Sequence, residues 1–135
     1  MTKFFVDKVI IITGASSGIG LAAARLFNSL GAKIVMAARS YEKLTALREE
    51  MSDKDKVLCV KTDVSVEEDC RNLIDKAVEK FGRIDILVNN AGISMRAMFL
   101  DLDLVVIKKL MDTNFWGTVY CTKYALPYLL KTKGS

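Results

Sequence analysis

The chain has 135 residues, which is enough for one domain with a substantial buried core and too few for two full domains. Apolar residues make up 51% of it, and a single proline with eight glycines excludes a collagen-like, disordered or low-complexity chain. The net charge of +4 comes from basic residues scattered along the sequence, without a dense run or aromatic interleaving. We therefore expect one globular domain over residues 1–135, with a solvated charged surface and no nucleic-acid partner.

The cysteines and the N-terminal sequence limit the kinds of catalytic and metal chemistry and the cellular compartment that we expect. Cys59, Cys70 and Cys121 show no C-x-x-C spacing, and the chain has no histidine to complete a zinc site or a catalytic pair. Each cysteine lies among apolar residues, which predicts buried free thiols in a reducing compartment. The N-terminal segment resembles neither a signal peptide nor a membrane span. We expect a cytoplasmic protein with no metal site and no membrane association.

Hydrophobic periodicity predicts strands and helices that alternate from the N-terminus. Residues 9–12 form a β-branched run before Thr13-Gly14, the pattern of a strand buried on both faces. Later in the chain we expect a second strand over 34–38 and a third strand over 57–60. Between them we expect a helix that Ser40 caps and that extends to about Met51. Between the first two strands, a helix from Gly18 to Gly31 is predicted, with an apolar stripe made of Ile19, Leu21, Ala22, Ala23, Leu26, Phe27 and Leu30.

The second half of the chain continues this alternation. Ser65-Val66-Glu67-Glu68 has the form of a capping box before a helical stripe that ends at Gly82. Residues 86–88 predict a fourth strand that closes on Asn89-Asn90-Ala91-Gly92, and a long helical pattern runs from about 103 to 131. The alternation predicts an α/β Rossmann-type fold, a doubly wound parallel sheet in the strand order 3-2-1-4. A ligand crevice is expected at the carboxyl ends of the first and fourth strands.

The segment Thr13-Gly14-Ala15-Ser16-Ser17-Gly18-Ile19-Gly20 lies between a buried strand and a helix, as a glycine-rich phosphate loop requires. Gly14 would permit the tight turn, Gly18 would let the backbone approach a pyrophosphate, and Gly20 would allow close helix packing. A Walker A loop is excluded because no Gly-Lys-Ser/Thr closes the segment. The alternative is a turn that merely needs glycines. The expected cofactor-binding residues of this segment are Gly14, Ser16, Ser17, Gly18, Ile19 and Gly20.

Arg39 stands at the tip of the second expected strand, about twenty residues after the loop. A dinucleotide site without a 2′-phosphate usually offers Asp or Glu here to the ribose hydroxyls, whereas a guanidinium can pair with a 2′-phosphate. The sequence therefore favours NADP(H) over NAD(H). The alternative is that Arg39 is a solvated surface residue.

With these motifs in view, the chain resembles the N-terminal half of a short-chain dehydrogenase/reductase over nearly all of its length. The resemblance rests on Thr-Gly-x-x-x-Gly-x-Gly at 13–20 and on Asn-Asn-Ala-Gly at 89–92, at compatible spacing. It implies that Asp63 and Val64 lie beside the adenine ring of the cofactor. It also implies cofactor contacts from the second motif, made by Asn90, Ala91 and Gly92. Plain turns are the alternatives for 89–92 and for Asp63.

In such enzymes an Asn in the long helix takes part in a water-mediated proton relay. The resemblance assigns this catalytic role to Asn114. The spacing places Asn114 on a small, apolar helix face with Gly117 and Cys121 that would pack on the sheet. An Asn there is costly unless its amide finds partners. The alternative is a structural hydrogen bond to the neighbouring loop.

The family's chemistry is hydride transfer between a nicotinamide cofactor and a carbonyl or alcohol, using a Ser and a Tyr-x-x-x-Lys motif. In this chain, Tyr120 and Lys123, like Tyr128 and Lys131, are separated by only two residues. The resemblance places Ser135 immediately before a fifth strand, with the catalytic Ser, Tyr and Lys beyond it. We therefore expect the cofactor-binding half of an NADP(H)-dependent oxidoreductase acting on a small carbonyl or alcohol, inactive by itself.

The long helix has a second apolar side that includes Val105, Trp116 and Val119. The corresponding helix of the family resembles a subunit interface, which predicts a homo-oligomer formed through residues 103–131. Packing of a missing half against the same surface is the alternative. The alternative to an oxidoreductase function is a non-catalytic dinucleotide-binding sensor or regulator. A methyltransferase of similar topology would leave Arg39 and residues 89–92 unexplained.

Overall fold

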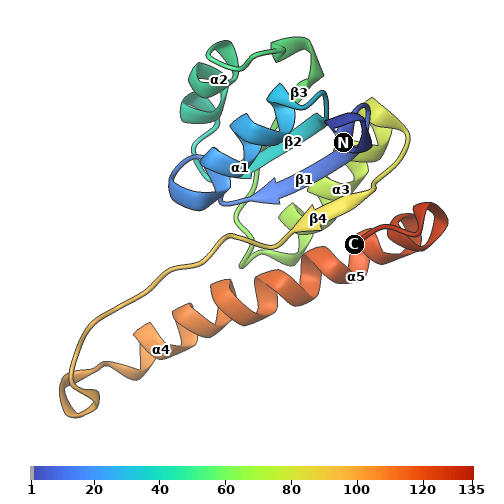
Figure 1. Cartoon of the computed structure of the whole chain (residues 1–135). Helices are drawn as coiled ribbons and strands as arrows, with labels where there is room; N and C mark the ends of the chain where they lie inside the picture. Colours follow the sequence, from blue (N-terminus) through green and yellow to red (C-terminus); the bar gives the residue numbers. More distant parts are fainter. Residues whose placement is uncertain (1) are drawn as a thin grey trace.

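A computed structural model describes residues 2–135 of the chain (Figure 1). The strands are β1 (Val9–Thr13), β2 (Lys33–Ala38), β3 (Val57–Lys61) and β4 (Ile86–Val88). The α-helices are α1 (Gly18–Ser29), α2 (Tyr41–Glu49), α3 (Glu67–Phe81), α4 (Leu104–Met111) and α5 (Gly117–Thr132). Short 3-10 helices cover Thr2–Phe5, Lys54–Lys56 and Phe99–Asp101, and a π-helical turn covers Asp112–Trp116.

The strands form one parallel sheet in the order β3-β2-β1-β4, which confirms the predicted fold class. Ile10 of β1 pairs with Ile34 of β2 on one side and with Ile86 of β4 on the other. All residues of β1 are buried, as expected for a central strand of a parallel sheet that helices cover on both faces.

The core has two layers, one on each face of the sheet. Ile10 and Ile12 pack with residues of α1 and α2, whereas Val9 and Ile11 pack with residues of α3 and α5. Successive side chains of a strand point to opposite faces, so one apolar run supplies both layers. Figure 1 shows the sheet between these two sets of helices. The doubly wound arrangement brings the carboxyl ends of all the strands to one edge.

The apolar stripe predicted for the first helix is wrong in part. Ile19 is 81% exposed, whereas the buried positions of α1 are Gly20, Ala24 and Asn28. Small residues let the helix backbone approach the sheet closely, so they and not the large side chains define the buried face. Asn28 is buried because its amide is satisfied: Nδ2 donates to the Asp53 carbonyl at 3.0 Å and Oδ1 accepts from the Asp53 amide at 2.9 Å.

The capping box predicted at residues 65–68 does not form. Val66 is the N-cap of α3, and no side chain caps it. The Ser65 hydroxyl instead donates to Asp63 Oδ1 at 2.6 Å, and the Asp69 carboxylate accepts from the Asp63 amide at 2.9 Å. The polar groups of this segment therefore stabilise the turn after β3 rather than the start of the helix.

Other predicted helix ends agree with the structure more closely. Ser40 caps α2, since its Oγ accepts from the Lys43 amide at 3.3 Å, although the helix ends at Glu49 rather than near Met51. Gly82 ends α3 in the left-handed conformation, with φ of +76°.

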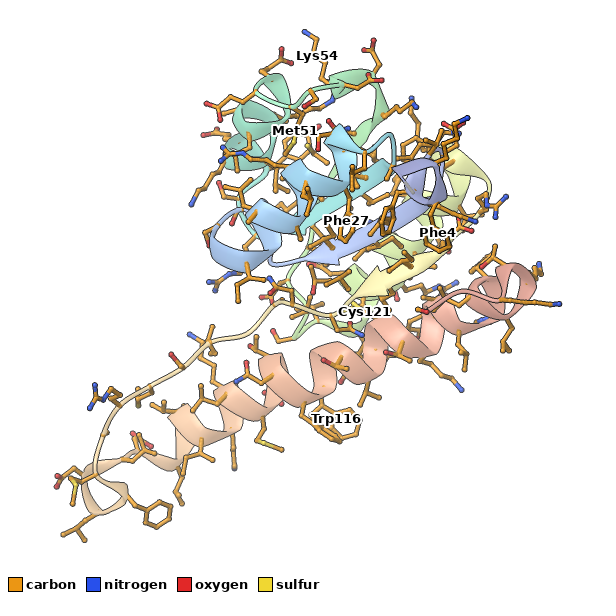
Figure 2. All side chains as sticks on the ribbon, in the orientation of Figure 1. Phe4, Phe27, Met51, Lys54, Trp116 and Cys121 are labelled. Carbon is orange, nitrogen blue, oxygen red and sulfur yellow. The ribbon has the colours of Figure 1, made fainter. Side chains whose placement is uncertain are left out.

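The predicted long helix is observed as α4, the π-helical turn and α5, which follow one another without a break (Figure 1). Its buried positions are Gly117, Cys121, Ala125 and Leu129, spaced by four along α5. None of the α4 residues is buried. In Figure 2 the labelled Cys121 lies on the side of the helix that faces the sheet, and Trp116 lies on the opposite side. Only the α5 part therefore contributes to the core.

β4 lies at an edge of the four-stranded sheet, next to β1. Beside it, the Leu87 amide donates to the Ser135 carbonyl at 2.8 Å, and the Ser135 amide donates to the Asp85 carbonyl at 3.0 Å. These two bonds follow the pattern of parallel strand pairing. Ser135 thus pairs with β4 as a parallel neighbour does.

Two predictions about composition can be compared with the structure. Cys59, Cys70 and Cys121 are buried and free, as their apolar neighbours predicted. Among residues 2–135, no helix is both long enough and apolar enough to pass through a lipid bilayer.

Candidate functional site

A cavity of about 460 Å³ lies at the carboxyl ends of the strands. Its walls come from the segments that follow β1, β2, β3 and β4, and from α4 with the π-helical turn. It therefore occupies the crevice that a 3-2-1-4 sheet creates where the chain reverses its winding direction. Of the predicted cofactor-binding residues, those that line it are Gly14, Ser16, Ser17, Arg39, Asp63, Val64, Asn90, Ala91 and Gly92.

The turn between β1 and α1 depends on its glycines. Gly14 has a φ of +63° and Gly18 a φ of +55°, both in the left-handed region that favours glycine. A Cβ at Gly14 would lie 2.9 Å from Cα of Ala91, so a larger residue would separate the turn from the loop after β4. Two segments far apart in the sequence thus approach backbone to backbone.

Three predicted residues at the start of α1 lie outside the cavity lining. Gly20 is buried, and a Cβ there would clash with the Gly14 carbonyl and the Asn90 side chain. Gly18 has open space around it, and Ile19 projects from the helix with 81% of its surface exposed. The packing expected of Gly20 is therefore observed, while the Ile19 side chain points away from the site.

Thr13 and Asn90 join the two loops through a compact hydrogen-bond network. Thr13 Oγ1 accepts from the amides of Asn90 at 3.0 Å and Ala91 at 2.9 Å, and donates to the Val88 carbonyl at 3.4 Å. Asn90 Nδ2 donates to the carbonyls of Thr13 at 3.1 Å and Gly14 at 3.2 Å. Asn90 is therefore more than a turn former, because its side chain fixes the glycine turn. Thr13 was not among the predicted site residues, and its signal in the sequence is a hydroxyl at the buried end of an apolar strand.

Basic side chains line the cavity where β2 ends. Arg39 directly follows β2 and is exposed, and Lys43 in the first turn of α2 lines the same cavity. The ion pairs formed within residues 2–135 involve neither of them. Arg39 was predicted as a site residue, whereas Lys43 was not. The signal for Lys43 in the sequence is its distance of four residues from Arg39, across a helix start that Ser40 caps.

The turn after β3 is held by its own polar groups and by two helices. Asp63 Oδ1 accepts from the Ser65 amide at 3.0 Å and from its hydroxyl at 2.6 Å, so Asp63 forms a local turn and also lines the cavity. Val64 is buried, and its carbonyl accepts from Cys70 Sγ at 3.3 Å. A Cβ at Gly117 would lie 2.7 Å from Cγ2 of Val64, which shows how closely α5 packs on this turn.

Asn114 lies in the π-helical turn and is exposed, so it does not pack on the sheet as expected. Its Oδ1 accepts from the Ile93 amide at 2.8 Å and its Nδ2 donates to the Ile93 carbonyl at 2.7 Å. The alternative, a hydrogen bond to the neighbouring loop, is the one observed.

Lys109, Asp112 and Thr113 also line the cavity, from α4 and the π-helical turn. The helical periodicity of this segment gave no signal for them. Their place in the site depends on how the long helix returns beneath the strand ends, which is a property of the whole fold.

The family model for short chain dehydrogenase matches residues 8–135 of this sequence. The chain belongs to the short-chain dehydrogenase family. Two relatives are an 11-beta-hydroxysteroid dehydrogenase A of Sesamum indicum, 45% identical over 130 residues, and an uncharacterized oxidoreductase of Bacillus subtilis, 46% identical over 123 residues. These matches cover 94% and 90% of this chain, but only 37% and 35% of the relatives. The chain thus spans little more than a third of their length.

Solved structures of this short-chain dehydrogenase family show the same fold. A glucose/ribitol dehydrogenase from Brucella melitensis superposes with a TM-score of 0.90 at 33% identity, covering 94% of this chain and 54% of the other. A 3-ketoacyl-(acyl-carrier-protein) reductase from Brucella melitensis, complexed with NADH, gives 0.86 at 33% identity, covering 92% and 51%. The homologues are oxidoreductases, and a nicotinamide dinucleotide accompanies this last one.

Proposed function

We propose that this chain is the NADP(H)-binding half of an oxidoreductase that transfers a hydride between NADP(H) and a small carbonyl or alcohol substrate. The observation that carries the proposal is a single cavity lined both by the glycine turn after β1 and by Arg39 after β2. Membership of the short-chain dehydrogenase family supports the class of reaction.

The glycine turn suits a pyrophosphate. α1 begins at Gly18, and its first intrahelical bond runs from the Leu21 amide to the Ser17 carbonyl at 3.2 Å. The preceding amides of Gly18, Ile19 and Gly20 therefore have no helical acceptor and remain available to an anion. The Ser16 and Ser17 hydroxyls add donors, and the open space around Gly18, where no side chain projects, leaves room for close approach.

Other residues of the lining would hold the rest of the dinucleotide. We assign Arg39 to the 2′-phosphate, because its exposed guanidinium stands at the position where NAD-specific sites carry an acid. Asp63 and Val64 would lie beside the adenine ring, and the segment Asn90–Gly92 would contact the cofactor beyond the pyrophosphate.

When bound, NADP(H) supplies or accepts the hydride. The residues of this chain bind and orient it, while Asn114, held by Ile93, would position a water molecule of a proton relay. The catalytic Ser, Tyr and Lys would belong to the part of such relatives that lies beyond the matched region. We also propose a cytoplasmic location, which the three buried free cysteines support.

Assembly is part of the proposal. Val105 and Trp116 are 68% and 44% exposed on the long helix, and Val119 extends the same apolar side. Apolar side chains grouped along one helix face usually mark an interaction surface. We propose a homo-oligomer that forms through residues 103–131.

The cofactor preference is tested by titrating the chain with NADP⁺ and NAD⁺ in calorimetry, with Arg39→Asp as the variant. We expect tighter binding of NADP⁺ by the native chain and a reversed preference in the variant, because a carboxylate repels the 2′-phosphate and accepts from ribose hydroxyls. Arg96→Asp makes the same charge change at an exposed residue outside the cavity lining and serves as control. Equal affinity changes for both cofactors in Arg39→Asp would contradict the assignment.

A further inference from the structure

We infer that Lys43 is a second determinant of cofactor choice, and that it binds the 2′-phosphate of NADP(H) together with Arg39. The inference rests on the proposed function and deepens it, because it concerns the same cavity. It gives a role in the site to a side chain that the glycine and Asn-Asn-Ala-Gly motifs do not include.

The geometry places Lys43 and Arg39 on one wall of the cavity. Arg39 and Ser40 connect β2 to α2, and the Lys43 amide donates to Ser40 Oγ at 3.3 Å. This bond fixes the first turn of α2 relative to the end of β2. All three residues line the cavity, so a guanidinium, a hydroxyl and an ammonium group are available along one stretch of its wall.

Neither cation is neutralised by the protein. Other basic side chains of this region have acidic partners: Lys54 lies 2.9 Å from Glu49, and Lys56 lies 3.1 Å from Asp7. The ion pairs formed within residues 2–135 do not include Arg39 or Lys43. Like charges held on one wall repel each other, and a bound anion removes that repulsion.

The acidic groups in the cavity lining do not neutralise Arg39 or Lys43. They are Asp63 and Asp112, and Asp63 Oδ1 already accepts two hydrogen bonds from Ser65. The Ser40 hydroxyl accepts from the Lys43 amide, which leaves its own proton free to donate to an anion. The wall after β2 therefore offers donors and positive charge.

The position of this wall favours the 2′-phosphate over the pyrophosphate. The pyrophosphate belongs at the start of α1, after β1, whereas Lys43 follows the neighbouring strand β2, where the ribose lies in such sites. A phosphate monoester carries about −1.5 to −2 charge at neutral pH, and a ribose hydroxyl carries none. A second cation at this place should therefore strengthen binding of NADP⁺ and leave NAD⁺ almost unaffected.

The test compares Lys43→Gln with the native chain in calorimetric titrations of NADP⁺, NAD⁺ and the fragment 2′,5′-ADP. We expect Lys43→Gln to weaken NADP⁺ and 2′,5′-ADP about five- to tenfold, the range for an exposed charge-assisted hydrogen bond, and NAD⁺ less than twofold. Lys43→Arg should retain most of the affinity. Lys108→Gln is the matched control, because Lys108 is an exposed lysine outside the cavity lining.

The outcomes separate this inference from the proposed function. If the native chain prefers NADP⁺ and Arg39→Asp reverses the preference, but Lys43→Gln behaves like Lys108→Gln, the role of Lys43 is wrong and the proposed function stands. A loss in Lys43→Gln that is equal for NADP⁺ and NAD⁺ likewise overturns the role of Lys43. If the native chain shows no preference for NADP⁺ over NAD⁺, both proposals fail. Thermal unfolding of each variant, expected to match the native chain, confirms that the exposed substitution leaves the fold intact.

Discussion

Thr13 joins two segments of the candidate site through one hydroxyl group. It lies at the end of β1, is 1% exposed, and bonds with the backbone of Val88, Asn90 and Ala91. The Asn90 amide also donates to the Val88 carbonyl at 3.0 Å, so loss of the hydroxyl would leave the part-buried Ala91 amide as the donor without an acceptor. The shape of the glycine turn therefore depends on a residue outside the glycines.

Replacement of Thr13 by Val keeps the volume and removes the acceptor. We expect Thr13→Val to lower the free energy of unfolding by about 2 kcal/mol, as is typical when buried donors lose their partner. Thr13→Ser keeps the hydroxyl and loses one methyl group, which should cost about 1 kcal/mol. Urea unfolding followed by circular dichroism measures both. Equal stability of the two variants would show that the hydroxyl network contributes little.

Gly20 and Gly18 provide a second contrast at the residue scale. Gly20→Ala would force apart the Gly14 carbonyl and the Asn90 amide, an overpacking that costs about 1–3 kcal/mol, and would displace the glycine turn. Gly18→Ala has open space but a φ of +55°, which costs about 1 kcal/mol. We therefore expect Gly20→Ala to be the less stable variant in thermal unfolding. The reverse order would contradict the packing described for α1.

The role of a residue was predictable from the sequence where its type is tied to one backbone conformation, as glycine is to positive φ. Gly14 and Gly82 were expected at turns and have positive φ there. Asn114 was expected to pack on the sheet, but its amide group instead bonds with the backbone of Ile93 in the loop after β4. Ser65 was assigned to a capping box, in which its oxygen would accept from a backbone amide, but its hydroxyl instead donates to Asp63. Hydrogen-bond partners that compete in space cannot be ranked from spacing alone.

At the scale of elements, Asp85 connects the start of β4 to the start of β1. Its Oδ2 accepts from the Val9 amide at 2.9 Å and from Arg83 Nε at 3.0 Å, and its Oδ1 accepts from the second Arg83 nitrogen at 2.6 Å. Burial by itself raises the pKa of Asp85, but the hydrogen bonds from Arg83 and Val9 outweigh it and hold the pKa below its ordinary value. The carboxylate is thus the form that the fold stabilises.

Because the pKa of Asp85 is lowered in the folded chain, the free energy of unfolding decreases as the pH falls into the acid range. The contribution of Asp85 is complete above its unfolded pKa near 4 and is lost as the pH falls through its lower folded pKa. We expect Asp85→Asn to lower the free energy of unfolding by about 2 kcal/mol at pH 7, and the difference from the native chain to shrink below about pH 4. Urea unfolding across this pH range measures it. A difference that is independent of pH would contradict the account.

The elements differed in how well their sequences predicted their packing. The strands were predicted closely because each contains a short apolar run, and β1 is buried throughout as expected. The buried face of α1 was predicted poorly, because Gly20 and Ala24 carry less hydrophobic signal than exposed Ile19. Close backbone approach, rather than side-chain hydrophobicity, determines which face of this helix is inside.

For the whole molecule, the exposed side of the long helix predicts self-association. Trp116 is 44% exposed and stacks on Tyr120 with ring centroids 5.8 Å apart, within an apolar surface that the core does not use. We expect the native chain to sediment as an oligomer and Trp116→Lys to shift it toward the monomer. Leu26→Lys, at a 57% exposed position of α1, should leave the oligomer unchanged and is the control. A monomeric native chain at micromolar concentration would contradict this prediction.

Because the family's catalytic Tyr and Lys follow the cofactor-binding half, we expect this chain to bind the cofactor without catalysing the reaction. Since neither of the Tyr–Lys pairs has the Tyr-x-x-x-Lys spacing, we expect no oxidation of NADPH above the uncatalysed rate with a panel of carbonyl substrates. A full-length short-chain reductase measured in parallel verifies the assay. Turnover by the purified chain would show that its own residues supply the proton-transfer chemistry.

The central claim is that the cavity at the strand ends is a dinucleotide site, and NMR of the 15.0 kDa chain tests it most directly. We predict that NADP⁺ shifts backbone amide signals of residues 14–20, 39–43, 62–65 and 90–93. Signals from Lys76, Glu79 and Lys80, which line a separate depression with Leu58, should not move. Shifts confined to these three residues, or no shifts at millimolar NADP⁺, would contradict the account.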